Sequence, residues 1–496
     1  MDSTFPNEFV WGAASSAFQI EGGAAKHLRG ESVWDRFCRR PDAVRGGADG
    51  RTACDHFHRY EEDVRLMRTV GLRAYRFSIA WPRVIKDGVS EVNPCGLDFY
   101  DALVDRLLEN DIEPWVTLFH WDLPVALHDR GGWLNRASAD WFAHYAATLA
   151  DRLSDRVTHW ITLNEPQVFL RFGYAEGTHA PGLRLSLEEQ LLAAHHVLLA
   201  HGRAVQAIRA HARSSCRIGF APNAHVAYPA SDRPEDVEAA RRSTFEIDSP
   251  SLWSHTWFAD PVFRGAYPED GLKSCGDAAP KFTSHDMETI SQPLDFLGLN
   301  LYAGVPVRAG EGGMPTVVRL AHGHARNALD WPVAPEALRW GTRFLWERYA
   351  QPIVITENGM SNLDWVDLDG RVRDPQRIDF TRRYLIELGR AIADGADVRG
   401  YFHWSIMDNF EWAEGYKDRF GLIHVDFETQ RRTLKDSAHW YRRVIESNGA
   451  VLALSADSAG EPRITAHRAM SVDSIDGGAR DLSATSPDQA TAPPPA

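Results

Sequence analysis

Two short runs of the sequence pass from apolar residues directly to an amide and a carboxylic acid. In WITLNEP (160–166) the apolar residues end at Asn164 and Glu165, and in PIVITENG (352–359) they end at Glu357 and Asn358. Burying a lone charged carboxylate is costly, so an acid at the end of a buried strand needs a chemical reason. A pair of carboxylic acids can cleave a glycosidic bond, one donating a proton to the departing oxygen and the other attacking the anomeric carbon. We therefore take Glu165 and Glu357 as a candidate catalytic pair.

This chemistry requires opposite protonation states for the two acids. Glu165 follows Trp, Ile and Leu residues, which would raise its pKa by desolvation. Arg76 and Tyr302 are candidates for keeping Glu357 ionised. A single acid at a strand end is as often a structural ion pair or cap, so the interpretation depends on the residues at the other strand ends.

The elements that would position these acids are short apolar runs alternating with helical segments. Strands that are apolar on both faces and alternate with amphipathic helices indicate parallel βαβ units. Eight such runs predict a single (β/α)8 TIM barrel of the α/β class. The runs cover 9–16, 74–81, 114–120, 159–165, 217–223, 294–302, 352–359 and 399–409, with helices expected at 100–111, 141–154 and 187–212.

An open, doubly wound sheet is the alternative fold. It would carry a glycine-rich phosphate turn after the first strand, and WGAASSAFQIEGG lacks the usual spacing. We expect the catalytic barrel domain to cover 1–450. Residues 451–496 are rich in Ser, Ala, Asp and Pro with few large apolar residues, which predicts a disordered tail.

The overall composition limits the possible partners. The net charge is −14, from 54 basic and 68 acidic residues, which argues against nucleic acid or an anionic membrane as a partner. No apolar stretch approaches the roughly 20 residues needed to cross a bilayer, and the N-terminus lacks a signal-peptide pattern. Five scattered cysteines without a CxxC pair fit a reducing compartment. We therefore expect a cytoplasmic protein with a small-molecule partner; the oligomeric state stays open.

In a (β/α)8 barrel the carboxyl ends of the strands meet at one mouth. The expected strand ends carry carboxylates, amides and indoles, which can hydrogen-bond a polyhydroxylated ring and stack on its apolar face. Such a set suits neither phosphate nor metal. The residues are Gln19, Glu21, Arg76, Trp81, His120, Trp121, Asp122, Asn164, Glu165, Asn223, Asn300, Tyr302, Glu357, Asn358, Trp404, Asp408, Asn409, Glu411 and Trp412.

Several longer motifs carry a family resemblance. FVWGAASSAFQIEG, YRFSIAWPRV, HWDLPVALHDRGGW, TLNEP, GTHAPG, DFLGLNLY, ITENG and the stretch from YFHWSIMDNFEW to DRFGLIHVDF occur in this order between Phe5 and Ser447. Together they resemble glycoside hydrolase family 1, the β-glucosidase family. The resemblance implies a retaining β-glycosidase that hydrolyses terminal non-reducing β-D-glucosyl residues, and also galactosides or fucosides, through a covalent glycosyl-enzyme. It implies no cofactor and no metal, and a role in carbohydrate metabolism such as cellulose degradation.

The resemblance also assigns roles to individual residues. Glu165 would be the acid/base and Glu357 the nucleophile, with Tyr302 and Arg76 in contact with the nucleophile. For a double displacement the two carboxyl groups should lie about 5–5.5 Å apart. Substrate binding would fall to Gln19, His120, Trp121, Asn164, Asn300, Trp404, Glu411, Trp412 and Phe420, with Gln167, Asn223 and Trp331 on the aglycone side. Many relatives have Trp where this sequence has Gln167.

Variants of the family pattern narrow the substrate. The 6-phospho-β-glycosidase branch has Ser at the position of Glu411 and supplies Lys and Tyr near Asp418 and Phe420. Acids at Glu411 and Asp418 would repel a sugar phosphate, so plain glycosides are favoured. The alternative is a catalytically inactive relative that binds a sugar or a protein. Such relatives typically lose one of the two glutamates, and this chain keeps both. Transglycosylation instead of hydrolysis as the main task stays open.

Other polar clusters are better explained as structure. His195, His196, His201 and His211 share one expected helix but have no carboxylates at matching turns, as a converging metal site would require. His56 and His58, with Glu61 and Glu62, open the helix before the second strand, where solvated surface or scaffold is expected. The charged run RRPDAVRGGADGR (39–51) predicts an exposed loop near the barrel mouth.

Overall fold

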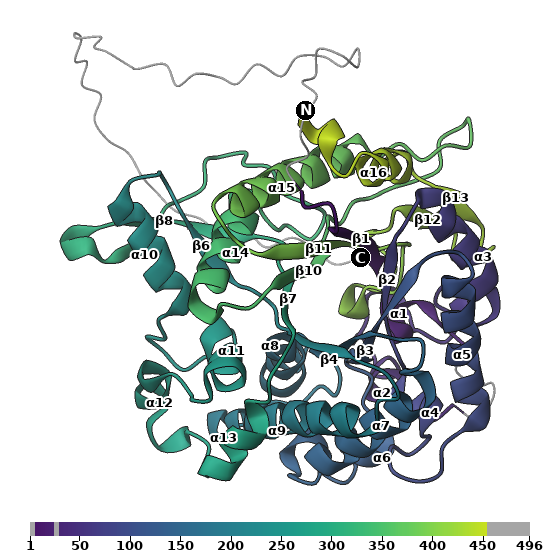
Figure 1. The fold of residues 1–496 in the computed structure, drawn as a ribbon, viewed down its shortest axis with the longest axis horizontal. Coiled ribbons are helices and arrows are strands. Elements are labelled where there is room, and N and C mark those ends of the chain that lie inside the picture. The colour runs from purple at the N-terminus through teal and green to yellow at the C-terminus, as the bar shows by residue number, and fades with distance from the viewer. Residues whose placement is uncertain (1–4, 24–28, 454–496) are drawn as a thin grey trace, which may run out of the picture. The chain divides into compact units, whose positions relative to one another are not determined.

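The computed structural model describes residues 5–23 and 29–453 (Figure 1). The tail predicted from residue 451 lies outside this part of the chain, except for its first three residues. These belong to a short 3₁₀ helix, η7 (Ala450–Ala453).

Eight parallel strands close into a barrel with helices around it (Figure 1), which confirms the predicted (β/α)8 fold and excludes the open sheet. Each strand corresponds to one of the eight apolar runs. In order around the barrel the strands are β1 (Val10–Ala14), β11 (Val398–Trp404), β10 (Ile353–Asn358), β7 (Phe296–Asn300), β5 (Arg217–Ala221), β4 (His159–Asn164), β3 (Glu113–Phe119) and β2 (Ala74–Ser78).

The long helices pack outside the barrel and bury their apolar faces against it. The three helices expected from the sequence correspond to α5 (Pro94–Leu108), α7 (Ser138–Leu153) and α9 (Leu187–His211). Further helices of the outer layer are α3 (His56–Val70), α10 (Pro234–Phe245), α11 (His255–Arg264), α12 (Glu269–Cys275), α13 (Ser284–Ile290), α14 (Glu336–Tyr349), α15 (Pro375–Ala393) and α16 (Asp436–Glu446). Short helices near the mouth are α1 (Ala17–Ile20), α2 (Val33–Phe37), α4 (Trp81–Val84), α6 (Val125–His128) and α8 (Pro166–Leu170).

Two small sheets outside the barrel were not expected from the sequence. One joins β6 (Val226–Pro229), β8 (Gly304–Ala309) and β9 (Pro315–Val317), and the other pairs β12 (Ile423–Val425) with β13 (Arg432–Leu434). Because β6 follows β5 and β8 follows β7, the first sheet extends the chain beyond the carboxyl ends of two barrel strands. It thereby adds a wall beside the mouth.

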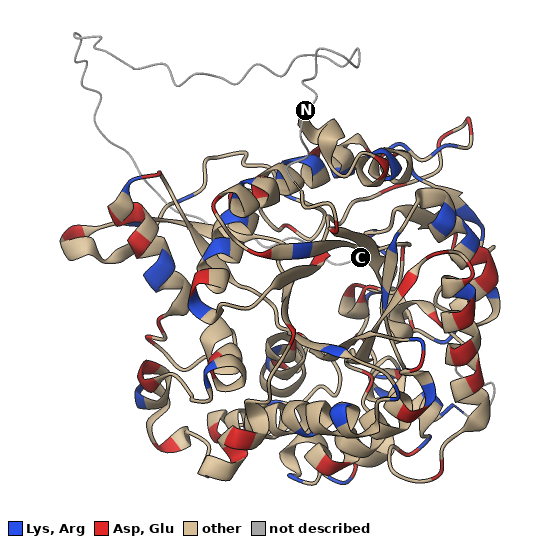
Figure 2. Cartoon of the chain, in the orientation of Figure 1, with Lys and Arg blue, Asp and Glu red and all other residues tan. Residues whose placement is uncertain are grey.

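Acidic and basic residues are interspersed along the outer helices (Figure 2). Many of them form ion pairs between neighbouring elements. Arg156, for example, lies 2.6 Å from Asp101 and 2.5 Å from Asp105 of α5. Within 5–23 and 29–453, no helix is both long and apolar enough to span a membrane.

Candidate active site

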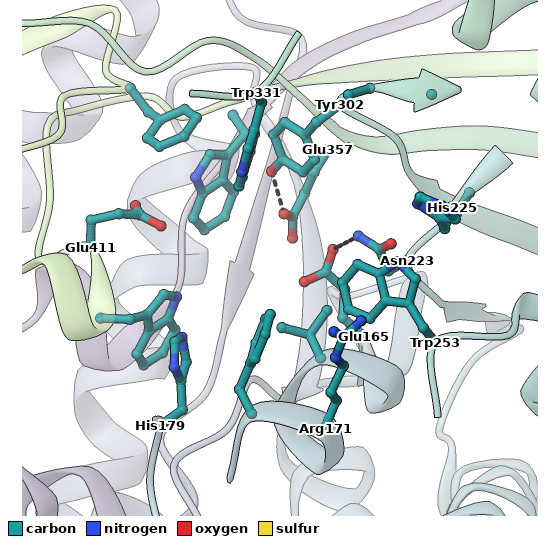
Figure 3. A pocket seen from close by; sticks show the side chains of 18 of the residues that line it. Glu165, Arg171, His179, Asn223, His225, Trp253, Tyr302, Trp331, Glu357 and Glu411 are labelled. Atoms are coloured by element: carbon teal, nitrogen blue, oxygen red, sulfur yellow. Dashed lines mark hydrogen bonds between the residues drawn. The ribbon is translucent and has the colours of Figure 1, made fainter. Parts of the chain in front are cut away.

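A cavity of about 460 Å³ opens at the carboxyl ends of the barrel strands (Figure 3). Eleven of the residues expected at the mouth line it, whereas Glu21, Trp81, Asp122, Asn358, Asp408 and Asn409 are among those that do not. The eleven are His120, Trp121, Glu165, Asn223, Tyr302, Trp331, Glu357, Trp404, Glu411, Trp412 and Phe420. The strand ends therefore converge on one space large enough for a sugar ring and part of a second group.

Glu165 is held at the turn between β4 and α8. Its backbone has a left-handed φ of 46°, and its N–H donates to the Ala221 carbonyl at 2.8 Å. Pro166 then starts the helix at a position where its missing N–H costs nothing. Asn223 Nδ2 donates to Glu165 Oε1 at 3.0 Å (Figure 3). Burial, with the nearby charge of Glu357, raises the pKa of Glu165 to about 8, so Glu165 is protonated at neutral pH. The expected direction of this shift is confirmed.

Glu357 is the penultimate residue of β10, and both of its carboxylate oxygens are hydrogen-bonded. Arg76 Nη1 lies 2.5 Å from Oε1, and the Tyr302 hydroxyl donates to Oε2 at 2.7 Å. Burial raises the pKa of Glu357, while the Arg76 charge and the Tyr302 hydrogen bond lower it, and the net shift is upward. The two expected partners are thus in place, but burial outweighs them, so the pKa of Glu357 lies above its usual value. Arg76 contacts Glu357 and does not contact Glu165. When the pair of acids holds one proton, that proton therefore resides on Glu165. Figure 3 shows the two carboxyl groups turned toward one another across the cavity.

A network of amides locks the strand ends beneath the cavity. Asn164 Oδ1 accepts hydrogen bonds from Arg76 Nη2 at 2.5 Å and Asn300 Nδ2 at 3.0 Å. Thr356 Oγ1 donates to Asn300 Oδ1 at 2.6 Å. Burial and the Arg76 charge place the pKa of His120 well below its usual value, so the ring is neutral. Its Nε2 therefore accepts from Asn164 Nδ2, 3.1 Å away. Arg76, Asn164 and Asn300 thus support the cavity from below and are not on its lining.

Glu411 lines the cavity on the side away from Glu165 (Figure 3). Gln19, at the end of α1, lies behind it and donates through Nε2 to Glu411 Oε2 at 3.4 Å and to Asn409 Oδ1 at 3.1 Å. Burial and the charge of Asp418 place the pKa of Glu411 well above its usual value. Glu411 can therefore offer a proton as well as accept one in a hydrogen bond to a hydroxyl.

Aromatic rings stand on two sides of the cavity. Trp121 and Trp412 lie 4.5 Å apart between ring centroids, and both have left-handed backbones. Trp121 Nε1 is anchored to the Asn164 carbonyl at 2.9 Å. Across the cavity, Trp331 packs against Tyr302 with 5.4 Å between centroids and against Phe420 with 6.2 Å. These faces can hold the apolar side of a sugar ring.

Gln167 does not line the cavity. It is buried, its Nε2 donates to the Asn223 carbonyl at 3.0 Å, and its Oε1 accepts from the Asn223 N–H at 3.3 Å. Gln167 therefore fixes the backbone of Asn223, and only Asn223 and Trp331 of the three residues expected on the aglycone side reach the cavity.

Several lining residues were missed by the sequence argument. They are Val168, Arg171, Phe172, His179, Ala224, His225, Trp253, Ala303, Gly304, Val305 and Pro332. Ala224, His225 and Ala303 come directly after expected strand ends and could have been found by extending each run by a few positions. Trp253 lies in a long connection between α10 and α11, where no local pattern points to the mouth.

The histidines set aside as structural have separate partners. His195 Nδ1 contacts the Tyr267 hydroxyl at 3.0 Å, His196 Nδ1 the Trp133 carbonyl at 3.0 Å, His201 Nδ1 the Thr162 hydroxyl at 2.6 Å, His211 Nδ1 Asp151 at 3.1 Å and His56 Nδ1 Asp63 at 2.7 Å. In the part of the chain that the structure describes, no group of three or more His, Cys, Asp or Glu residues could hold a metal ion.

The charged loop at 39–51 does reach the mouth. Arg45 Nε lies 2.7 Å from Glu414, two residues after Trp412 of the cavity lining. Most of the loop is exposed, as expected.

A (β/α)8 barrel with two facing carboxylic acids at its mouth defines a class of glycoside-cleaving enzymes. Comparison with known proteins identifies the family within this class. The profile of Glycosyl hydrolase family 1 matches residues 1–450, and the chain belongs to this family of glycoside hydrolases.

Two curated relatives are similar over almost their whole length. Beta-glucosidase A of Acetivibrio thermocellus is 42% identical over 452 residues, covering 90% of this chain and 99% of the relative. The 1,4-beta-D-glucan glucohydrolase of Thermotoga neapolitana is 42% identical over 446 residues, with the same coverage. Among solved structures, the beta-glucosidase from Thermotoga maritima in complex with glucoimidazole superposes with a TM-score of 0.82 at 41% identity, covering 90% of this chain and 99% of that one.

Proposed function

We propose that this enzyme is a retaining β-glucosidase that removes terminal non-reducing β-D-glucosyl residues and also accepts β-D-galactosides or β-D-fucosides. The observation that supports it best is the pairing, in one cavity, of a protonated acid without a cationic partner and an acid held by Arg76 and Tyr302. Relatives named as beta-glucosidases support the choice of glucose.

In the first step Glu357 attacks the anomeric carbon while Glu165 gives its proton to the glycosidic oxygen, and the aglycone departs. The charge of Glu357 is one cause of the raised pKa of Glu165. Formation of the glycosyl ester removes that charge, so the pKa of Glu165 falls. The Glu165 carboxylate then takes a proton from the incoming water, whose oxygen releases the sugar. This route requires a carboxyl separation of about 5–5.5 Å.

The other lining residues, together with Gln19, Asn164 and Asn300 directly behind the lining, would recognise the sugar hydroxyls and ring. In this proposal Gln19, His120, Asn164 and Glu411 bind hydroxyl groups, and Trp404 and Trp412 provide apolar surface. Trp121, Asn300 and Phe420 complete the sugar-binding set. The catalytic barrel domain ends at about residue 450.

The decisive experiment removes each acid separately. Glu357→Ala should abolish hydrolysis of 4-nitrophenyl β-D-glucoside, by on the order of 10⁴-fold or more in kcat. Glu165→Ala should keep partial activity on substrates with good leaving groups, and azide should accelerate it by attacking the glycosyl-enzyme in place of base-activated water. Glu446→Ala, which removes an exposed partner of Arg442 on α16, is the matched control. If Glu357→Ala turns over at the wild-type rate, the assignment is wrong.

Both acids are in place, so nothing favours the catalytically inactive alternative. Product analysis with added sugar acceptors would separate hydrolysis from transglycosylation. We further propose that short β-1,4-glucans such as cellobiose, derived from cellulose degradation, are among the substrates. The enzyme would work in the cytoplasm, where its five unpaired cysteines remain reduced. Cell fractionation tests the location.

A further inference from the structure

One wall of the cavity stands beside Glu165 and Asn223 and combines a positive charge with aromatic rings. We define this outer wall as Arg171, Phe172, His225 and Trp253, all of which line the cavity. Figure 3 shows Arg171, His225 and Trp253 on the side of the cavity that carries Glu165 and Asn223. The backbone fixes the position of Arg171 relative to Glu165, because α8 starts directly after Glu165 and continues into the π-helical turn η3 (Arg171–Glu176).

The Arg171 guanidinium lies against two rings. Its Cζ is 4.8 Å from the centroid of Trp253 and 5.7 Å from that of Phe172. Nε donates to Glu176 Oε1 at 2.6 Å. Within residues 5–23 and 29–453, neither Nη group makes a hydrogen bond, so two of the three guanidinium nitrogens remain available. Stacked guanidinium groups of this kind suit a planar carboxylate, which they can bind through two parallel hydrogen bonds.

Arg171 is also the one Lys or Arg among the described residues that line the cavity. The neighbouring His225 does not add to its charge, because burial and the Arg171 cation lower the pKa of His225. Glu176 neutralises Arg171 only weakly, since the two side chains are 39% and 38% exposed and a pair this open is largely screened by water. A ligand carboxylate can therefore compete with Glu176.

The outer wall faces the leaving group if the proposed function holds, on which this inference rests. Glu165 donates its proton to the oxygen that carries the aglycone, so the surface next to Glu165 lies beside the aglycone. We propose that Arg171 determines aglycone specificity and that the enzyme prefers β-glucosides whose aglycone is an aromatic ring bearing a carboxylate. The ring would pack against Trp253 and Phe172, and the carboxylate would bind the free Nη groups of Arg171.

The test compares two substrates that differ only in charge at the far end of the ring: 4-carboxyphenyl β-D-glucoside and its methyl ester. The quantity measured is the ratio of kcat/KM for the acid to that for the ester. Differences in leaving-group chemistry are the same in every variant, so a change of this ratio between variants reports the side chain. Arg171→Gln, Arg171→Lys and Glu176→Gln are compared with wild type. Arg383→Gln is the matched control, because Arg383 likewise donates through Nε to a nearby acid, Asp379, at 2.7 Å and is half exposed on α15.

Arg171→Gln should lower the ratio about three- to fivefold, mainly through KM, and Arg171→Lys should lower it less. Glu176→Gln should raise the ratio, because it removes the competing carboxylate. Arg383→Gln should leave it unchanged, and added salt should reduce the wild-type ratio by screening.

If Arg171→Gln folds and keeps the wild-type ratio, the inference is wrong, although cleavage of the ester still supports the proposed function. If Arg171→Gln does not fold, a Glu176→Gln ratio equal to wild type rules the inference out. If wild type cleaves neither substrate, the proposed function itself fails.

Discussion

Two groups of charged side chains in the described chain differ in their charge balance; Glu411 and Arg419 are partly exposed, and the other members are buried. The cavity cluster contains three acids and one cation: Glu165, Glu357, Glu411 and Arg76. The paired cluster contains three acids and three cations: Asp364, Asp374, Asp408, Arg377, Arg419 and Lys435.

Every acid of the paired cluster contacts a cation. Lys435 Nζ lies 2.6 Å from both Asp364 and Asp408, and Arg377 lies 2.7 Å from both Asp364 and Asp374. Burial opposes ionisation of Asp364 and Asp408, but the surrounding cations outweigh it and their pKa values fall. Asp408 also accepts from the Gly421 N–H at 3.0 Å. Burial nevertheless raises the pKa of Asp374 and lowers that of Lys435. The ion pairs pin the loops after β10 and β11, and the second of these loops carries Glu411, Trp412 and Phe420 of the cavity lining.

In the cavity cluster the acids outnumber the cation, and the pKa values of Glu165, Glu357 and Glu411 all rise. The same end of the barrel therefore uses paired charges for rigidity and acids in excess over cations for chemistry. Changes in the paired cluster should lower the stability of the fold. Changes in the cavity cluster should alter the rate and its pH dependence, and should change the stability in the opposite direction.

The largest effect should come from breaking the paired cluster. Lys435→Met leaves two buried carboxylates without their shared cation and should lower the free energy of unfolding by about 3–5 kcal/mol. Urea denaturation measures this change. Lys273→Met, on the exposed face of α12, is the control and should have little effect. An equal, small loss for both variants would mean that the paired cluster does not stabilise the fold.

Replacing a cavity acid should change the free energy of unfolding in the opposite direction. Between pH 4.5 and about 8 the folded chain holds a proton on Glu165 that the unfolded chain releases, so this residue makes wild type less stable as the pH rises. Glu165→Gln should raise the free energy of unfolding by about 1–3 kcal/mol at pH 7. The gain should grow with pH across this window and vanish below it. A gain that is independent of pH, or equal to that of the exposed Glu446→Gln, would contradict the assigned protonation.

The protonation of Glu165 should also determine how kcat/KM depends on pH. Because Glu165 must be protonated to assist the leaving group, kcat/KM for an alkyl β-glucoside should be constant just below pH 8 and fall tenfold per unit above it. A 2,4-dinitrophenyl glucoside needs no proton and should lack this basic limb. If both substrates show the same limb, it belongs to another group.

The smallest expected effect is on the acidic limb of the pH profile of kcat/KM. Tyr302→Phe removes the hydrogen bond to Glu357 Oε2, so the pKa of the nucleophile should rise further. Since Glu357 must be ionised to attack, the acidic limb of kcat/KM should move up by about one pH unit. Tyr416→Phe, whose hydroxyl donates to the Asp49 carbonyl, is the control. An unshifted limb would mean that Tyr302 does not tune the nucleophile.

The parts of the fold and site that could be predicted from the sequence are those that depend on residues close together in the chain. The eight apolar runs predict the eight barrel strands because a strand buried on both faces needs apolar residues throughout. Glu165 and Glu357 were found because each interrupts such a run at its carboxyl end. The sheet of β6, β8 and β9 was missed because its strands lie in connections whose pairing depends on the barrel already being closed.

Residue identity and spacing by themselves determined the barrel, the two acids and the aromatic and amide character of the mouth, because burial and strand periodicity act between near neighbours. Only the tertiary structure decided which groups meet. Closure of the barrel brings Arg76 to Glu357 across 281 positions, turns Gln167 away from the cavity and sets Arg171 against Trp253. The pKa of each acid was likewise decided there, because desolvation and charge act through space and sum over neighbours that the chain order does not reveal.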